Sequence, residues 1–151
     1  MRMTNRISSH ESTVIKEQYL GRLGRPYQRI ANSLYLIRGG TVNVKLTRPR
    51  SSGRYWFNIQ KRADSFLWIC WNKRIQESTY YWIPAREMRE LIALGAYRDW
   101  TWERRGRRIP NFMIDTITDE YVAGKTRVSI RQFRDVKHPP LNQRPRPSSR
   151  S

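Results

Sequence analysis

The sequence predicts an α+β protein, with an α/β-like order of elements and a mixed central β-sheet flanked by helices. Three observations predict this class: a helical pattern near the start, a middle region of short segments rich in β-branched and aromatic residues, and a second helical pattern after a proline. Of the 151 residues, 38% are hydrophobic and 12% aromatic, which suffices for one domain with a modest core. We therefore expect a single folded domain over residues 9–136, between a basic arm at 1–8 and a disordered, basic, proline-rich tail at 137–151.

The first predicted element is a helix that ends at a glycine. Ser8 and Glu11 have the spacing of a capping box, in which a serine and an acid three residues later satisfy backbone N–H groups at the helix start. Apolar residues then recur on roughly one helical face as far as Gly24, where a Gly-Arg-Pro sequence stops the helix.

A β-hairpin is predicted next. Residues 33–37 and 41–48 resemble strands, and the glycine pair Gly39-Gly40 between them is typical of a tight turn. Apolar and polar residues alternate along 41–48. One face of this strand is therefore expected to be buried.

Three further strands and a second helix are predicted in the centre of the chain. The strands, at 54–60, 66–72 and 79–83, are rich in Trp, Tyr, Phe and Ile. The run within 66–72 is apolar on both faces, which indicates a central strand. Pro84 then lies where a helix begins and Gly95 where it would end.

The last third of the chain gives weaker patterns. Residues 100–108 are interpreted as an arginine-rich loop with two tryptophans, and the pattern of 111–121 is ambiguous. Residues 127–130 are the last predicted strand.

The charge of the chain predicts a polyanionic partner. Lysine and arginine together number 30 against 12 acidic residues, which gives a formal net charge of +18. A nucleic acid would relieve the resulting repulsion, and high salt should weaken its binding. No long apolar run and no basic amphipathic helix is present, so no membrane partner is expected. The single cysteine, Cys70, cannot form an internal disulfide, which favours an intracellular compartment, either the bacterial cytoplasm or an organelle.

Several chemistries lack the residues that they need. His10 and His138 lie at opposite ends of the chain, which excludes a zinc site of Cys and His ligands. The Gly39-Gly40 pair lacks the Lys-Ser/Thr that a phosphate-binding glycine loop carries. Because no histidine falls in the folded centre, a serine or cysteine nucleophile has no histidine base there.

One group of residues in the first half suits phosphodiester hydrolysis. Glu11 lies on the first helix, a short strand begins at Ser33, and Asn43 and Lys45 share one face of the next strand because side chains alternate. Oxygen ligands of this kind hold Mg²⁺, which activates water, while a lysine stabilises developing negative charge.

Four sequence runs follow one another with a characteristic order and spacing. They are Thr41-Val42-Asn43-Val44-Lys45, Arg54-Tyr55-Trp56-Phe57-Asn58-Ile59, Ala63-Asp64-Ser65-Phe66-Leu67 and Tyr80-Tyr81-Trp82-Ile83-Pro84-Ala85. Over roughly residues 9–94 the chain thereby resembles the PD-(D/E)XK nuclease superfamily, and within it the small, intron-encoded homing endonucleases. The resemblance implies a restriction-endonuclease-like core, and it rests on strand signatures more than on any single motif.

The resemblance also implies the roles of the site residues. Glu11 would be the helix acid, Asn43 an amide-bearing ligand and Lys45 the catalytic lysine, with Mg²⁺ held by Glu11 and Asn43. The family's strand aspartate falls at Ser33 or Asn32, and neither is a carboxylate. Without that acid, magnesium affinity and cleavage would be impaired.

Each of these residues also has a structural interpretation. Glu11 is explained as the capping-box acid, and Lys45 as a plain phosphate contact. In a different register Glu17 or Asp64 would supply the acid. Asp64 is more simply a residue that caps the turn before the next strand.

The predicted contacts with the DNA backbone are cations near the sheet edge and its turns, where acidic neighbours are scarce. They are Arg48, Arg50, Arg54, Lys61, Arg62, Arg104, Arg105, Arg107 and Arg108. A solvated charged face is the structural alternative. Four tryptophans at strand spacing, Trp56, Trp68, Trp71 and Trp82, are interpreted as core residues, and the alternative is a platform on which bases stack.

The leading hypothesis is a double-stranded DNA-binding protein that resembles a homing endonuclease. A homo-oligomer is expected, because a chain this small needs symmetry to cover a long site. The alternative is a non-catalytic structural RNA-binding protein, such as an organellar ribosomal component. A transcriptional repressor ranks last, since the sequence has no helix-turn-helix signature.

Overall fold

The computed structural model describes residues 9–38, 40–58, 62–74, 77–93, 98–104, 107–123 and 125–136. Its elements follow in the order α1 (Ser9–Arg22), β1 (Tyr27–Ala31), β2 (Leu34–Ile37), β3 (Gly40–Thr47), β4 (Tyr55–Asn58), β5 (Ser65–Asn72), β6 (Glu77–Pro84), α2 (Ala85–Ala93), β7 (Arg98–Arg104), β8 (Arg107–Asp115), β9 (Glu120–Ala123), β10 (Thr126–Ser129) and the 3₁₀ helix η1 (Arg131–Phe133). They form an α+β fold, as the sequence predicts. The predicted arm at 1–8 and tail at 137–151 lie outside the described residues.

The first sheet is mixed. Its five strands lie in the order β1-β2-β3-β5-β6. β3 and β5 run parallel, with Val42 opposite Ser65 and Thr47 opposite Cys70, whereas the other neighbours are antiparallel. The first six residues of β5 are buried, so its predicted place in the interior of the sheet is confirmed.

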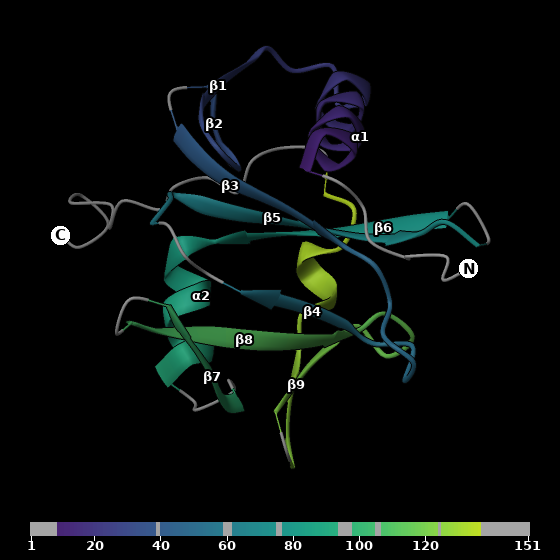
Figure 1. Ribbon diagram of the computed structural model, residues 1–151, viewed down its shortest axis with the longest axis vertical. Coiled ribbons are helices and arrows are strands. Elements are labelled where there is room, and N and C mark those ends of the chain that lie inside the picture. Colours follow the sequence, from purple (N-terminus) through teal and green to yellow (C-terminus); the bar gives the residue numbers. More distant parts are fainter. Residues whose placement is uncertain are drawn as a thin grey trace, which may run out of the picture.

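A second sheet, which the sequence analysis does not anticipate, covers one face of the first. Its strands lie in the order β10-β9-β8-β4, with β7 also paired to β8, and all its pairs are antiparallel. Figure 1 shows this sheet below β3, β5 and β6, with α1 on the opposite side and α2 beside one end. One face of the central sheet is therefore covered by a helix and the other mainly by strands.

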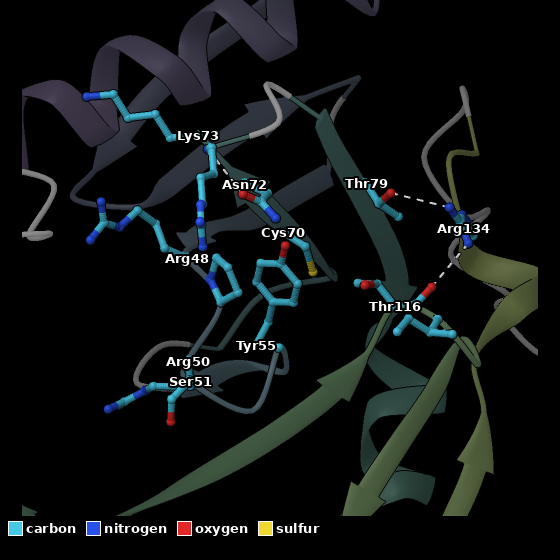
Figure 2. Close-up of a pocket in the computed structure, with 14 residues that line it drawn as sticks. Arg48, Arg50, Ser51, Tyr55, Cys70, Asn72, Lys73, Thr79, Thr116 and Arg134 are labelled. Carbon is cyan, nitrogen blue, oxygen red and sulfur yellow. Dashed lines mark hydrogen bonds between the residues drawn. The ribbon is translucent and has the colours of Figure 1, made fainter.

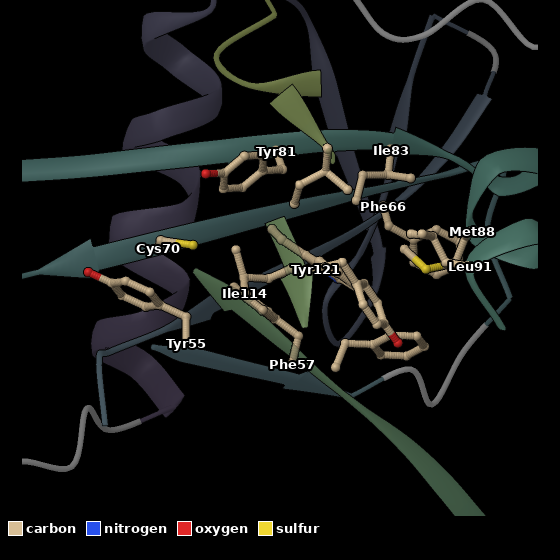
Figure 3. Packing of buried hydrophobic residues seen from close by; sticks show 13 residues of the cluster. Tyr55, Phe57, Phe66, Cys70, Tyr81, Ile83, Met88, Leu91, Ile114 and Tyr121 are labelled. Atoms are coloured by element: carbon tan, nitrogen blue, oxygen red, sulfur yellow. The ribbon is translucent and has the colours of Figure 1, made fainter. Parts of the chain in front are cut away.

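The larger core lies between the two sheets. Phe66, Trp68 and Cys70 point from β5 toward the second sheet, because alternate side chains of a strand face the same way. They meet buried side chains of β4, β8 and β9, among them Phe57 and Ile114 (Figure 3). Burial of these large apolar groups holds the second sheet against the first.

A smaller core lies between the first sheet and α1. Leu67 and Ile69, which alternate with the residues above, point from β5 to this side. They pack with Val42 and Val44 of β3 and with Leu20 of α1. The predicted first helix therefore covers the valine face of β3.

The connection between the parallel strands β3 and β5 passes through the second sheet. After Thr47 the chain turns and forms β4 in the second sheet before β5 begins at Ser65. Parallel neighbours need a crossover of this kind, which is usually built on a helix. Because β3 and β5 are parallel, the loops that follow them leave from the same edge of the first sheet.

Most elements predicted between residues 9 and 93 are confirmed. α1 ends at Arg22, shortly before Gly24, which has a positive φ of 68° and so adopts a conformation that favours glycine. β2 and β3 form the expected antiparallel hairpin, and β4, β5 and β6 occupy the three predicted strand regions. α2 starts directly after Pro84, while its predicted stop at Gly95 lies outside the described residues.

Three expectations differ from the structure. Residues 100–108 contain the end of β7 and the start of β8, with Arg104 opposite Arg107, so the predicted loop is wrong. Backbone pairing with a neighbour can keep an arginine-rich segment extended even though its composition resembles that of a loop. Tyr27–Ala31 is an edge strand that the sequence analysis leaves unassigned. Ser33 lies in the β1–β2 turn with a φ of 64°, and the strand begins only at Leu34.

Asp119 ties the end of the described chain to the first sheet. Its carboxylate accepts hydrogen bonds from Tyr81 Oη at 2.6 Å, Arg134 Nη1 at 2.8 Å and Arg131 Nε at 3.3 Å. Asp119 is 5% exposed and has a φ of 55°, a left-handed conformation that aspartate adopts more readily than most residues. One buried carboxylate thus joins the β8–β9 turn, β6 and η1.

In the described part of the chain, no helix combines the length and the apolar character that crossing a bilayer requires.

Burial of tyrosines predicts that stability falls in strong alkali. Burial raises the pKa of Tyr35, Tyr55 and Tyr80 from 10.0 to about 12, and for Tyr35 the neighbouring Glu17 adds to the effect. The folded state therefore favours the neutral phenols. Their stabilising contribution is complete below pH 10.0 and is lost as the pH rises to about 12.

We accordingly expect the free energy of unfolding to fall across this alkaline window. Phenolate absorbance of the folded protein should develop at higher pH than that of the urea-unfolded chain. The variant Tyr35→Phe should lose less stability over the same range than the unmodified protein. Identical absorbance titrations for the folded and unfolded chains would contradict this prediction.

Candidate nucleic-acid interface

The structure places Ser33 beside a lysine of α1. Lys16 Nζ donates a hydrogen bond to Ser33 Oγ at 3.1 Å, and both residues are buried. The backbone carbonyl of Ser33 accepts a hydrogen bond from Val44 N–H at 2.8 Å, which holds the β1–β2 turn against β3. A buried amino group therefore lies next to the position at which the resemblance places the strand aspartate.

Asn43 and Lys45 share one face of β3, as the alternation predicts. The valines on either side of Asn43 pack against Leu20 of α1. Asn43, which is fully buried, and Lys45, which is partly buried, therefore point to the other side of the sheet, toward which Trp68 also points. Glu11 is exposed on α1. The helix that carries the predicted acid thus covers the opposite face of β3 from the predicted amide and lysine.

The two alternative acids are engaged in structural contacts. Glu17 Oε2 accepts a hydrogen bond from Tyr35 Oη at 3.2 Å. Asp64 Oδ2 accepts hydrogen bonds from Thr41 N–H at 2.8 Å and from Thr41 Oγ1 at 3.2 Å. Asp64, the residue just before β5, therefore holds the start of β5 against the start of β3.

The described residues do not fit the magnesium site that the resemblance implies. Carboxylates usually anchor Mg²⁺, yet the described residues contain no group of three or more His, Cys, Asp or Glu side chains that could hold a metal ion. Ser33 offers only a neutral hydroxyl, which already accepts a hydrogen bond from Lys16.

A basic groove lies at the edge of the fold where β3 and β5 end. Its volume is about 980 Å³, and its walls come from both sheets: the turn after β3, the tip of the β5–β6 hairpin and the β8–β9 turn (Figure 2). Five cations contribute to its lining: Arg48, Arg50, Lys73, Arg74 and Arg134. Among the described residues, no carboxylate lines the groove.

The positive charge of the groove is concentrated on one wall. Arg48, Arg50, Lys73 and Arg74 form no ion pair with any acid whose side chain the structure describes. Arg134, on the other wall, is paired with carboxylates, since its Nη1 lies 2.8 Å from Asp119 Oδ1 and its Nε lies 3.5 Å from Asp135 Oδ2. The first wall therefore carries the charge that an anion would meet.

The floor of the groove presents hydrogen-bond donors. Burial raises the pKa of Tyr55 to about 12, so its phenol keeps its proton near neutral pH. Asn72 Oδ1 accepts a hydrogen bond from Arg74 N–H at 3.1 Å, which leaves the amide Nδ2 as a donor. Burial also raises the pKa of the Cys70 thiol, so this lining residue stays neutral. The floor thus adds neutral donors to the cationic wall.

The predicted DNA contacts are distributed unevenly. Arg48 and Arg50 line the groove, and Arg62 is exposed. Arg54 is held within the fold, with Nε 3.7 Å from Asp115 Oδ2 and Nη1 3.4 Å from Met113 Sδ. The remaining predicted contacts lie outside the described residues or have side chains that are not described: Lys61, Arg104, Arg105, Arg107 and Arg108.

Three groove cations were missed by the sequence analysis: Lys73, Arg74 and Arg134. The sequence does contain a signal for Lys73 and Arg74, because they directly follow β5 just as the predicted contact Arg48 directly follows β3. Had these strands been assigned as parallel, both loops would have been placed at one edge of the sheet. Arg134 follows a 3₁₀ turn after the last strand, and no sequence pattern indicates where that segment returns.

The four tryptophans that the sequence analysis singles out divide into two classes. Trp68 and Trp82 are completely buried, which confirms their interpretation as core residues and excludes them as a base-stacking platform. Trp56 and Trp71 are partly exposed. The guanidinium of Arg50 lies 5.9 Å from the Trp56 ring centroid, a cation–π contact that positions this groove arginine.

Comparisons of this chain with protein-family models, with curated proteins and with solved structures gave no match.

Proposed function

We propose that this protein binds double-stranded DNA through its cationic surface and does not cleave it through a bound metal ion. The observation that carries the proposal is the separation of charges in the fold. The cationic wall of the basic groove has no acid partner among the side chains that the structure describes, whereas the buried or partly buried carboxylates of that set serve internal contacts. A chain of net charge +18 with such a surface favours a polyanion whose counterions it can displace.

Two further considerations narrow the proposal. The resemblance of residues 9–94 to homing endonucleases favours duplex DNA over RNA. The hydrogen bond between Lys16 and Ser33 argues against metal-dependent hydrolysis, because a serine hydroxyl that already accepts from an amine stands where a carboxylate ligand would be needed. Since one small chain contacts only a short stretch of duplex, the proposal includes a symmetric oligomer on DNA.

Binding is tested by fluorescence anisotropy with labelled duplex DNA, duplex RNA and single-stranded DNA of one sequence. We expect duplex DNA to bind most tightly. If the four unpaired groove cations each contact a phosphate, affinity should fall by about a hundredfold between ~50 and ~200 mM salt. Tighter binding to RNA would favour the structural RNA-binding alternative. Absence of salt-sensitive binding to any of the three would refute a nucleic-acid-binding function.

Cleavage is tested separately on supercoiled plasmid with and without Mg²⁺. We expect no magnesium-dependent nicking, because the described residues lack the carboxylates of a metal site. Nicking that disappears in the variant Lys45→Ala would contradict this part of the proposal and would restore the nuclease interpretation.

A further inference from the structure

We propose that the basic groove holds the phosphate groups of a short run of one DNA strand; this inference rests on the proposed function. It assigns the contact to a defined place in the fold. The groove is distinct from the Lys16 and Ser33 pair, which lies where α1 meets the β1–β2 turn.

Two separate chain segments converge at the groove. Arg48 and Arg50 lie in the turn after β3, and Lys73 and Arg74 lie at the tip of the β5–β6 hairpin. The parallel register of β3 and β5 brings both segments to one edge, where all four residues line one groove (Figure 2). Cations from two loops can hold successive phosphates of one strand, which the cations of a single loop reach less well.

The floor of the groove offers hydrogen-bond donors that suit a phosphate. The Tyr55 hydroxyl and the Asn72 amide can both donate, and no carboxylate among the described residues lines the groove. A phosphate oxygen accepts hydrogen bonds and carries negative charge, so donors and cations around it are complementary. A cationic ligand would find no acceptor of opposite charge here.

The two walls of the groove differ in their net charge. Arg134 is neutralised by Asp119 and Asp135, and beside it Ile117 is 89% exposed on the β8–β9 turn. One wall therefore offers cations, and the other offers an apolar side chain with little net charge. A sugar-phosphate chain has the same two sides, with phosphates on one and sugar carbons on the other.

The size of the groove indicates one strand. Its volume of about 980 Å³ lies near the upper end of the range of small-ligand sites, roughly 300–1,000 Å³. A B-form duplex is too wide to enter such a groove. One backbone of the duplex can run along the mouth with its phosphates facing the cationic wall.

The test compares charge-matched pairs of variants. Lys73→Ala/Arg74→Ala and Arg48→Ala/Arg50→Ala each remove two groove cations. The control, Arg86→Ala/Arg89→Ala, removes two exposed cations from α2, which follows the opposite end of β6 from the hairpin tip. Affinity for duplex DNA is measured over a series of salt concentrations, and thermal unfolding verifies that each variant is folded.

We expect each groove pair to weaken binding by roughly tenfold or more and to make the slope of log K against log salt shallower by about 2. The control pair should change affinity by less than about threefold. Equal losses in the groove and control pairs, with DNA binding retained in the unmodified protein, would overturn the groove assignment and leave the proposed function intact. If the unmodified protein does not bind DNA, both proposals fail.

A variant that changes no charge separates the contribution of the floor to DNA binding from that of the groove's net charge. Tyr55→Phe removes one hydroxyl and no formal charge, and we expect it to weaken DNA binding by a fewfold. Tyr35→Phe is its control, because that hydroxyl is bonded to Glu17 and lines no part of the groove. Equal affinities for the two phenylalanine variants would show that the floor does not contact the phosphate and would contradict the proposed geometry.

Discussion

Replacement of Asp119 by alanine is expected to lower the free energy of unfolding by about 2–4 kcal/mol. The largest part of this loss comes from Tyr81, which is completely buried and donates its hydroxyl to Asp119 at 2.6 Å. Without the carboxylate, that hydroxyl keeps its burial and loses its acceptor. Arg134 is also left without its closest partner, whereas Arg131 is mostly exposed, so its ion pair contributes little.

Two control variants separate the contributions at Asp119. Asp119→Asn keeps an acceptor for Tyr81 and suits the positive φ of 55°, so it should cost clearly less than alanine. Tyr81→Phe removes the donor and should cost only about 1 kcal/mol. Chemical denaturation of the three variants measures these differences. If Asp119→Ala were no more destabilising than Tyr81→Phe, the Asp119 carboxylate would not stabilise the contact between the β8–β9 turn, β6 and η1.

The elements that the sequence predicts correctly are those whose pattern is local. Gly24 marks the end of α1, and alternation along 41–48 identifies β3. The unbroken apolar run of β5 reports burial on both faces, which a strand in the interior of a sheet requires. Each of these signals depends on neighbours within a few residues.

The parts that the sequence does not predict depend on long-range pairing. β7 and β8 are joined by backbone hydrogen bonds, and their arginine-rich composition gives no sign of a sheet. The parallel pairing of β3 with β5 places Arg48 and Lys73 at one edge, although they are far apart in the chain. The contact of Lys16 with Ser33 is likewise not predicted from the sequence, because a lysine on a helix is ordinarily solvated.

Replacement of Trp68 by alanine is expected to destabilise the protein by about 3–5 kcal/mol and to do so mainly at the junction of the two sheets. Trp68 is completely buried and stacks on Phe57 of β4, with ring centroids 4.9 Å apart and planes 7° from parallel. It also contacts Phe112 of β8 at a centroid distance of 5.3 Å. Its loss opens a cavity at the place where the second sheet packs on β5.

The matched control for Trp68 is Trp82, a second tryptophan that is completely buried. Trp82 lies on the α1 side of the first sheet, and its Nε1 donates to Ser65 Oγ at 2.9 Å. Trp82→Ala should lower the free energy of unfolding by a similar amount, but it should loosen the packing of α1 and leave the second sheet in place. Trp68→Phe keeps an aromatic ring and removes an indole N–H that has no hydrogen-bond partner in the described structure, so it should cost less than Trp68→Ala.

Amide hydrogen exchange distinguishes these outcomes, because it reports local opening for each strand. Trp68→Ala should speed exchange in β4, β8 and β9 more than in α1, and Trp82→Ala should do the reverse. Because the walls of the basic groove belong to both sheets, loosening of the second sheet should also weaken DNA binding. We therefore expect weaker binding in Trp68→Ala and unchanged binding in Trp82→Ala. Uniform acceleration of exchange in both variants would mean that the two cores do not open independently. The core around Trp68 would then not be what holds the second sheet, and its wall of the groove, in place.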